Sequence, residues 1–210
     1  MDIVHPEIDS YLHSITPSRN QVLRDMEQLA AERNFPIVGP LVGRILYQYA
    51  RLLHPARILE LGSGYGYSAF WWALGTPPET RIYCTEGSAE NIRLGLQFLQ
   101  HAGFTNKVEY FEGDALGSMD QVNGEFDIVF MDIDKHQYPD GFRKAFPRLR
   151  KGGLFITDNV LWSGRIVEGE GSPSTLGVLE YNRLIYSTRG AFSVILPVRD
   201  GVAVTLKELA

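Results

Sequence analysis

The sequence predicts a doubly wound α/β fold, in which helices cover both faces of a mostly parallel sheet. From residue 57 onward, short apolar runs alternate with helical stretches. The runs are almost continuously apolar, as expected of strands that are buried on both faces. A short turn between the last two runs, at 199–201, indicates an antiparallel hairpin at one edge. We therefore expect a Rossmann-like, seven-stranded sheet.

The predicted strands and helices follow from these runs. The strands are expected at 57–61, 81–85, 107–111, 126–131, 154–157, 192–196 and 202–206. The helices between the earlier strands are expected at 67–74, 89–102 and 138–149. We expect residues 1–210 to form one domain, in which 1–55 are a helical N-terminal extension and 56–210 are the α/β core. Within the extension, 15–18 would cap a helix over 21–33, and Gly39-Pro40 would open another.

Composition excludes several classes of protein. The chain has 210 residues, of which 44% are hydrophobic and 21% charged, as in ordinary globular domains. The net charge of −5 argues against a broad nucleic-acid-binding surface, which is usually basic. The single Cys84 excludes an intrachain disulfide and a cysteine-rich zinc site. Because 1–10 lack a signal-peptide pattern and no apolar run is long enough to span a bilayer, we expect a cytoplasmic protein that does not enter the membrane.

Acidic residues stand at the carboxyl ends of four predicted strands: Glu60, Glu86, Asp132 and Asp158. In a doubly wound sheet, these strand ends border the crevice in which ligands bind. Carboxylates that lie close together repel one another unless a cation or several hydroxyl donors lie among them. The pattern therefore predicts a ligand site at this edge of the sheet.

A glycine-rich turn follows the first strand. Gly62, Gly64 and Gly66 allow a sharp turn and a close approach of the backbone to a ligand, and the next helix offers free N–H groups. The sixth position of the turn is Tyr67, where a dinucleotide-binding turn has Gly or Ala. Glu86 stands where an acid binds the hydroxyls of a ribose. A nucleotide-like cofactor is indicated, and NAD is disfavoured.

Asp132, Asp158 and Asn159 together offer two carboxylates and an amide carbonyl. These hard oxygen donors suit Mg²⁺ best, with Ca²⁺ or Mn²⁺ as alternatives. Three protein ligands leave about three positions of an octahedron for water and substrate, and two vicinal oxygens of a catechol-like group could fill two of them. An Asp-Asn pair alone could also be an ordinary turn. Asp132 at the neighbouring strand end favours the metal.

Four segments carry a resemblance to a known family. They read ILELGSGYGYS at 58–68, MDIDK at 131–135, TDNVLWSG at 157–164 and LPVRDG at 196–201. In this order they resemble the motifs of the class I O-methyltransferases of the catechol and caffeoyl-CoA family, over roughly residues 36–207. The resemblance implies S-adenosylmethionine as the cofactor and a hydroxyl, held on a divalent metal ion, as the methyl acceptor.

The resemblance also implies residues that bind the cofactor. They are Val38, Glu60, Gly62, Ser63, Ser68, Glu86, Gly113, Asp114, Ala115 and Asp134. Glu60, Gly62 and Ser63 would hold the methionine part, with Ser68 at its carboxylate. Glu86 would bind the ribose hydroxyls, 113–115 would line the adenine, and Asp134 would reach the methionine end, where a carboxylate suits an ammonium group. Val38 would close over the cofactor, although it could also be a simple packing residue.

The same resemblance assigns the catalytic roles. Asp132, Asp158 and Asn159 would bind the metal, Asp132 would also contact the substrate, and Lys135 would be the general base. A free phenol has a pKa of about 10, so little of it is ionised at neutral pH without a stabilising cation. A nearby dication would also disfavour the ammonium form of Lys135.

The acceptor side is less specific. Ser163 occupies a position where plant members carry an Asn that contacts the substrate. The change from Asn to Ser leaves open whether this residue contacts the substrate here. Trp162 could form a wall of the acceptor pocket or simply pack. The segment 164–175 is expected to border the pocket, and 4–15 to cover the acceptor side or a dimer interface. A small aromatic hydroxyl compound is the expected acceptor, and a homodimer the expected assembly.

Two other functions stay open. Some bacterial proteins similar to this family methylate a hydroxylated uridine in transfer RNA; the net charge of −5 weighs against this, but one loop of RNA needs only a local basic patch. An NAD-dependent oxidoreductase would rest on the glycine turn and Glu86 alone. It would leave Asp132, Asp158 and Asn159 unexplained.

Overall fold

The computed structural model describes residues 2–17, 20–169 and 171–208. The chain divides into two compact units, Tyr11–Val122 and Met1–Ser10 together with Asn123–Ala210. We call them the glycine-turn unit and the hairpin unit. The strand order over both is β3-β2-β1-β4-β5-β7-β6 in one seven-stranded sheet. The pairs β1–β2, β2–β3 and β4–β5 are parallel, and β7 is antiparallel to both β5 and β6, so the predicted fold class is confirmed.

The glycine-turn unit holds the first three strands. They are β1 (Arg57–Leu61), β2 (Arg81–Glu86) and β3 (Val108–Glu112), and both pairs are parallel. Its longer helices are α2 (Gln21–Arg33), α3 (Gly39–Leu53), α4 (Tyr67–Gly75) and α5 (Ala89–His101). Short helical turns lie at η1 (Thr105–Lys107), α6 (Ala115–Ser118) and η2 (Met119–Gln121). Helix α1 (Pro6–Ile15) begins in the other unit and ends in this one.

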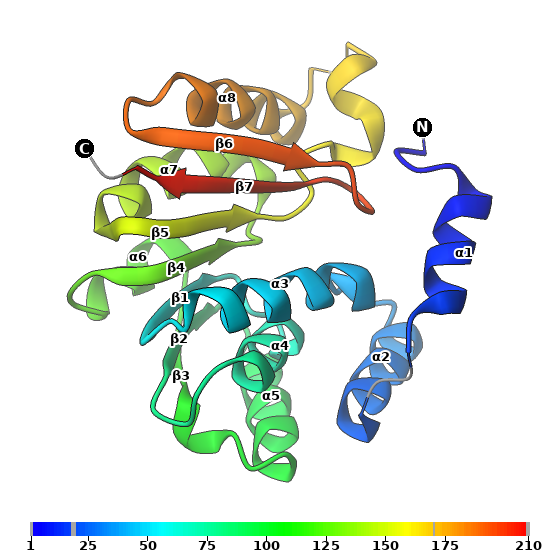
Figure 1. Cartoon of the computed structure of the whole chain (residues 1–210), viewed down its shortest axis with the longest axis vertical. Coiled ribbons are helices and arrows are strands. Elements are labelled where there is room, and N and C mark those ends of the chain that lie inside the picture. The colour runs from blue at the N-terminus through cyan, green and yellow to red at the C-terminus, as the bar shows by residue number, and fades with distance from the viewer. Residues whose placement is uncertain (1, 18–19, 170, 209–210) are drawn as a thin grey trace. The chain divides into compact units, whose positions relative to one another are not determined.

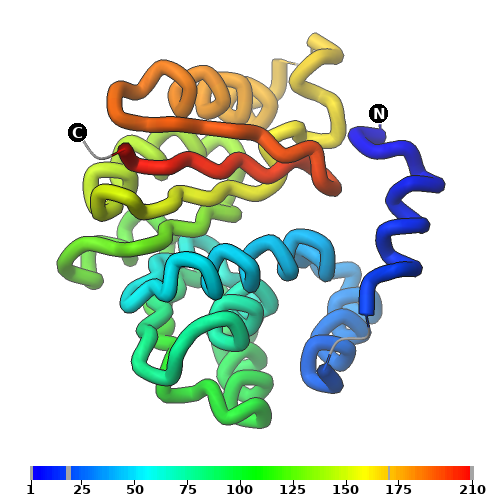
Figure 2. Tube along the Cα trace, in the orientation of Figure 1, coloured from blue at the N-terminus to red at the C-terminus, as the bar shows by residue number. Residues whose placement is uncertain are grey.

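Small residues let α3 and α4 pack closely in this unit, and Figure 2 shows the two helices side by side. A Cβ on Gly43 would lie 2.1 Å from Trp71 Nε1, and one on Gly75 would lie 2.8 Å from the Cβ of Ala50. Every residue of α4 except Leu74 is buried, which explains the continuous apolar run of that helix. The helix that follows the glycine turn is therefore fixed in the core.

The hairpin unit holds the other four strands. They are β4 (Phe126–Met131), β5 (Leu149–Thr157), β6 (Ala191–Leu196) and β7 (Val202–Lys207). The helices are α7 (Tyr138–Ala145) and α8 (Pro173–Ser187), with short turns at η3 (Lys135–Gln137), η4 (Phe146–Arg148) and η5 (Trp162–Val167). In Figure 1, β7 lies between β5 and β6, and α8 runs beside β6.

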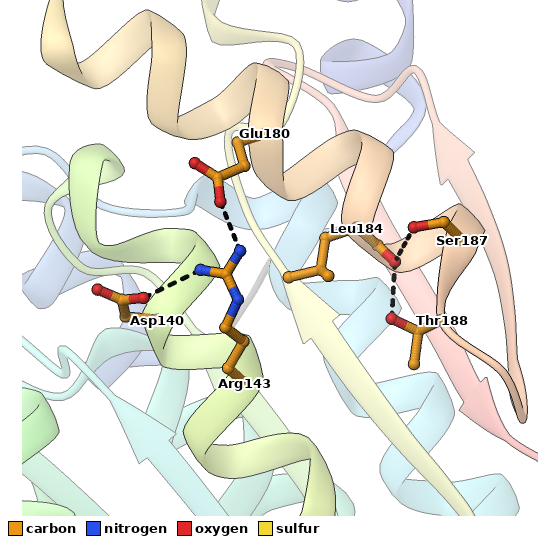
Figure 3. A network of polar contacts seen from close by, with 6 residues as sticks. All are labelled: Asp140, Arg143, Glu180, Leu184, Ser187 and Thr188. Carbon is orange, nitrogen blue, oxygen red and sulfur yellow. Dashed lines mark hydrogen bonds and ion pairs between the residues drawn. The ribbon is translucent and has the colours of Figure 1, made fainter.

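Aromatic packing and one exposed ion pair connect α7 with α8. The Phe142 ring lies 5.9 Å from that of Tyr181 and 5.1 Å from that of Phe155, all in the core. On the surface, the Arg143 guanidinium donates to Asp140 at 3.0 Å and to Glu180 at 2.5 Å (Figure 3). Because exposed ion pairs contribute little, the aromatic cluster holds the two helices together.

The structure corrects one predicted helix end, one predicted strand start and one predicted helix cap. The predicted helix over 138–149 ends at Ala145, before the short turn that contains Pro147, and β5 already begins at Leu149, five residues before its predicted start at 154. The cap of α2 is Asn20, whose side chain accepts from the Leu23 N–H at 2.9 Å, and not the segment 15–18. Residue 18 of that segment lies outside the described residues.

Candidate functional site

The two predicted carboxylate ligands follow neighbouring parallel strands of the hairpin unit. Met131 of β4 is in register with Thr157 of β5, so Asp132 and Asp158 leave the sheet side by side. The Asp158 N–H donates to the Met131 carbonyl at 3.2 Å, which continues the pairing beyond the strand ends. The register therefore brings together the two acids expected at this edge.

Asp158 is buried, and its side chain is only 1% exposed. Within the described part of the chain, neither of its carboxylate oxygens has a hydrogen-bond partner. The nearest cationic group is the Arg199 guanidinium, whose Nη1 lies 3.8 Å from Oδ2. Burial, and next the negative charge of Asp132, raise the pKa of Asp158 to about 7. The buried carboxylate thus accepts no hydrogen bond from the described residues, and its ionised form has only a guanidinium at 3.8 Å as a close counter-charge.

Asn159 begins a tight turn with unusual backbone angles. Its φ is +58°, in the left-handed region that Asn tolerates better than most residues. Trp162 and Ser163 also have positive φ, at +48° and +51°. The Trp162 N–H donates to the Asn159 carbonyl at 3.3 Å, and the Ser163 N–H donates to the Asp200 carboxylate. These bonds hold the predicted substrate-side residues beside the turn between β6 and β7.

Lys135 lies directly beside the predicted ligand Asp132. Its Nζ donates to Asp132 Oδ1 at 2.7 Å and to the Ile133 carbonyl at 3.3 Å. The ammonium also lies 5.8 Å from the centre of the Trp162 ring. The Lys135 side chain is 11% exposed, so this group is partly shielded from water. Asp134, which the resemblance assigns to the cofactor, is exposed.

A polar cavity of about 480 Å³ lies in the same unit. It is lined by Asp2, Ile3, Val4, Pro6, Asp9, Ser10, Asn159, Ser163, Arg199 and Asp200. Asn159 and Ser163 were predicted from the sequence, and the N-terminal segment was expected to cover this side. Arg199 and Asp200 were not assigned roles, although both belong to the LPVRDG segment.

Glu86 fixes the glycine turn in the other unit. Its Oε2 accepts from the Gly64 N–H at 2.8 Å, and its Oε1 accepts from the Ser88 N–H at 2.9 Å and from Asn91 Nδ2 at 3.2 Å. Glu86 therefore stabilises the glycine turn, in addition to its predicted contact with a ribose. This role could not be predicted from the sequence, because it depends on the direction of the Gly64 N–H.

The glycine turn has little space for side chains. The φ angles of Gly62, Gly64 and Gly66 are +81°, +52° and +83°. A Cβ on Gly66 would lie 2.4 Å from the Tyr110 hydroxyl oxygen. Next to the turn, buried Glu60 accepts from the Ser68 hydroxyl at 2.8 Å, so these two predicted cofactor residues lie together.

Apart from Asp134, which belongs to the hairpin unit, the other predicted cofactor residues lie in the glycine-turn unit. Gly113 has a φ of +136°, and its N–H donates to the Glu86 carbonyl at 3.0 Å. Asp114 caps α6, which begins at Ala115, by accepting from the Gly117 N–H at 2.9 Å. Ser63 and Val38 are both buried, at 6% and 4% exposed. Val38 directly precedes α3.

No group of three or more His, Cys, Asp and Glu side chains that could hold a metal ion occurs among the residues that the structure describes. The predicted set has two carboxylates and an amide, Asp132, Asp158 and Asn159. No helix within the described ranges is long and apolar enough to cross a membrane.

Comparisons with known proteins agree on one family. The family model described as O-methyltransferase matches residues 13–208. Caffeoyl-CoA O-methyltransferase 2 of Populus trichocarpa is 28% identical over 204 residues, which cover 90% of this chain and 83% of the poplar protein. A methyltransferase structure from Geobacter sulfurreducens is 30% identical, with a TM-score of 0.85 and coverage of 98% of this chain and 99% of that chain.

Two further structures contain forms of the cofactor. An O-methyltransferase from Bacillus cereus in complex with SAH is 26% identical, with a TM-score of 0.88 and coverage of 96% of this chain and 97% of that one. TomG from Streptomyces achromogenes, an O-methyltransferase in complex with SAM, is 26% identical, with a TM-score of 0.86 and coverage of 97% and 96%.

The sheet order and the glycine turn define an α/β methyltransferase that uses S-adenosylmethionine. The chain belongs to the O-methyltransferase family and is related to the caffeoyl-CoA O-methyltransferases. The glycine turn therefore belongs to a methyltransferase, and not to the NAD-dependent oxidoreductase considered from the sequence.

Proposed function

We propose that this enzyme methylates a hydroxyl of a small catechol-like or hydroxycinnamoyl-like aromatic compound, held on a divalent cation by Asp132, Asp158 and Asn159. The buried Asp158 carboxylate carries this proposal, since neither of its oxygens has a hydrogen-bond partner in the described part of the chain. A buried carboxylate without donors fits a metal ligand better than a structural acid. The oxygen-only donor set suits Mg²⁺ best, and Ca²⁺ or Mn²⁺ next.

The chain's own residues would then handle one proton and hold the reacting atoms in place. Lys135, in its neutral form, would accept the phenolic proton at Nζ. The phenolate oxygen would attack the methyl carbon of S-adenosylmethionine, so that the new O–C bond forms as the C–S bond breaks and S-adenosylhomocysteine leaves. A bound divalent cation would supply the charge that stabilises the phenolate. Holding oxygen and methyl carbon at attack distance would give much of the acceleration.

Apart from Asp134, the residues that we assign to the cofactor belong to the glycine-turn unit. We assign Glu86 to the ribose hydroxyls and Glu60, Gly62, Ser63 and Ser68 to the methionine part. Residues 113–115 would line the adenine. Asp134 would bind the ammonium, and Val38 would close over the cofactor. Positive φ at the three glycines supports this assignment, because such a turn exposes backbone N–H groups to a ligand.

We place the acceptor in the cavity of about 480 Å³, whose lining includes Asn159 and Ser163. That volume suits a small aromatic molecule. The ring of Trp162 would shield Lys135 from water, since the Lys135 ammonium lies 5.8 Å from its centre. The related poplar protein is named for a caffeoyl-CoA acceptor, which places a hydroxycinnamoyl group among the compounds to test.

The test is a methyl-transfer assay of the purified protein with S-adenosylmethionine. The acceptors are catechol, caffeate, caffeoyl-CoA, and transfer RNA with and without hydroxylated uridine. We expect transfer to a vicinal diphenol in Mg²⁺ and none in excess chelator. Undiminished turnover in chelator would remove the metal from the proposal. Transfer only to the hydroxylated RNA would replace the aromatic acceptor.

We also propose a cytoplasmic homodimer. Helix α1 has no buried residue, and its Ile8, Tyr11 and Ile15 are 52%, 58% and 57% exposed. Their spacing puts them on one side of the helix, as in a helix that packs against a partner. Sedimentation equilibrium should give twice the chain mass of 23.6 kDa. A single-chain mass at micromolar concentration would refute the dimer.

A further inference from the structure

Arg199 lies in the tight turn between β6 and β7 and contacts the buried acid of the hairpin unit. Its Nη1 is 3.8 Å from Asp158 Oδ2. The Arg199 backbone has a φ of +54°, a conformation that residues other than Gly rarely adopt. The turn is closed by the Gly201 N–H, which donates to the Val198 carbonyl at 2.9 Å. A strained position in a closed turn thus holds a guanidinium beside Asp158.

The two partners differ in exposure. The Asp158 side chain is 1% exposed, whereas that of Arg199 is 40% exposed. Asp158 directly follows β5, and its N–H donates to the Met131 carbonyl at 3.2 Å, so its backbone is held at the strand end. Arg199 can turn toward solvent, because its long side chain already reaches the surface. Of the two groups, only the guanidinium is free to leave.

We propose that Arg199 is a displaceable counter-ion, which neutralises the Asp158 carboxylate before a metal binds and competes with the divalent cation for that carboxylate. The inference rests on the metal site proposed above. A dication on Asp158 and a guanidinium 3.8 Å from Oδ2 would repel each other, so metal binding has to move Arg199 away.

The cavity offers the displaced guanidinium other partners. Arg199 lines it together with Asp2, Asp9 and Asp200. These are the acids among its lining residues, and Arg199 is the one base. A guanidinium that leaves Asp158 therefore enters a space with carboxylates on its walls. Metal binding would then change the charge of the space in which we place the acceptor.

The experiment is a calorimetric titration of chelator-treated protein with Mn²⁺, at pH 8 and with saturating S-adenosylhomocysteine. The variants are Arg199→Gln, which removes the charge, and Arg199→Lys, which keeps it. Arg165→Gln is the control, because Arg165 is an exposed arginine of the same unit that acts electrostatically on Asp200. Melting temperatures of all four proteins are measured in chelator and in saturating Mn²⁺.

We expect Arg199→Gln to bind Mn²⁺ about tenfold more tightly than the wild type, because a partly exposed charge at this distance is only partly screened. Arg199→Lys and Arg165→Gln should stay within about twofold of the wild type. In chelator, Arg199→Gln should melt about 2–6 °C lower than the wild type, since it loses the counter-ion. In saturating Mn²⁺ this difference should vanish.

Equal or weaker Mn²⁺ binding by Arg199→Gln would overturn the competition while leaving the metal site in place. A wild type that binds no Mn²⁺ would instead refute the proposed metal site and, with it, the competition. The counter-ion role has its own test, because an unchanged melting temperature of Arg199→Gln in chelator would refute it.

Discussion

Asp158 makes the stability of the metal-free protein depend on pH. Its folded-state pKa of about 7 lies above its ordinary value of 3.8. Between these pH values the folded chain binds a proton that the unfolded chain has lost. This extra proton stabilises the folded chain relative to high pH. The stabilisation is complete below the unfolded pKa of Asp158 and is lost as the pH rises through its folded pKa.

Replacing Asp158 by Asn should remove this dependence. In excess chelator at pH 8, we expect Asp158→Asn to be more stable than the wild type, by up to ~4 kcal/mol for a shift of about three pKa units. At pH 4 the gain should disappear. Urea unfolding at both pH values measures it, with Asp140→Asn, at an exposed position, as the control. Equal stability of variant and wild type at pH 8 would contradict the burial of an ionised Asp158.

Lys135 is the residue that the proposed mechanism requires as a base. Lys135→Arg keeps the positive charge beside Asp132, but a guanidinium does not give up its proton in the accessible pH range. We expect kcat to fall on the order of 10²- to 10⁴-fold, while the Kd for S-adenosylmethionine changes little. A pH–rate profile with calorimetry separates the two effects, and Lys151→Arg at an exposed position serves as the control. A variant profile identical to that of the wild type would exclude Lys135 as the base.

At the scale of elements, α8 packs directly on the backbone of η3. A Cβ on Gly177 would lie 2.4 Å from the Lys135 carbonyl oxygen and 2.7 Å from the His136 Cα. Backbone atoms cannot rotate away as a side chain can, so a methyl group at residue 177 would push α8 and η3 apart. Gly177 therefore sets the position of Lys135 without touching the reacting atoms.

Gly177→Ala should lower stability by about 1–3 kcal/mol and also reduce kcat. The sign of this change in stability is informative, because replacing Gly by Ala inside a helix normally stabilises the protein by up to about 1 kcal/mol. Gly171→Ala, just before α8, is the control for an added methyl group without a close contact, since a Cβ there meets no atom within 4 Å. Urea unfolding and steady-state rates give both quantities. A Gly177→Ala variant that is as stable and active as the wild type would show that the close contact is not needed.

Strands could be predicted from the sequence where burial alone decides them. The runs 57–61 and 126–131 coincide with β1 and β4, because both are apolar and buried on both faces. The start of β5 was missed, since Arg150, Lys151 and two glycines interrupt its apolar pattern. Pairing of Phe126 with Leu149 across an irregular register extends that strand, and no local pattern encodes it.

The candidate site also has features that could be predicted from the sequence and features that could not. Asp132 and Asp158 could be placed together because parallel strands in register end at one edge. The contact of Arg199 with Asp158 could not be foreseen, because it depends on a left-handed residue in a tight turn. Strand periodicity predicts which residues reach an edge, whereas the contacts of loop side chains need the backbone angles of each loop.

For the whole molecule, the family, the fold and the use of S-adenosylmethionine are established by independent findings. The central claim still to be tested is the divalent cation at the ends of β4 and β5. The roles proposed for the buried Asp158 carboxylate, for Lys135 and for the competing Arg199 guanidinium all depend on this cation. A direct view of that cation would test all of them together.

That view is an anomalous difference map at the manganese edge, from crystals grown with Mn²⁺, S-adenosylhomocysteine and catechol. We predict one strong peak with oxygen atoms of Asp132, Asp158 and Asn159 about 2.0–2.6 Å away, the range of hard-cation bonds to oxygen. Both catechol oxygens should complete the coordination, and Arg199 should have left Asp158. A map with catechol bound and no peak at these three residues would contradict the account.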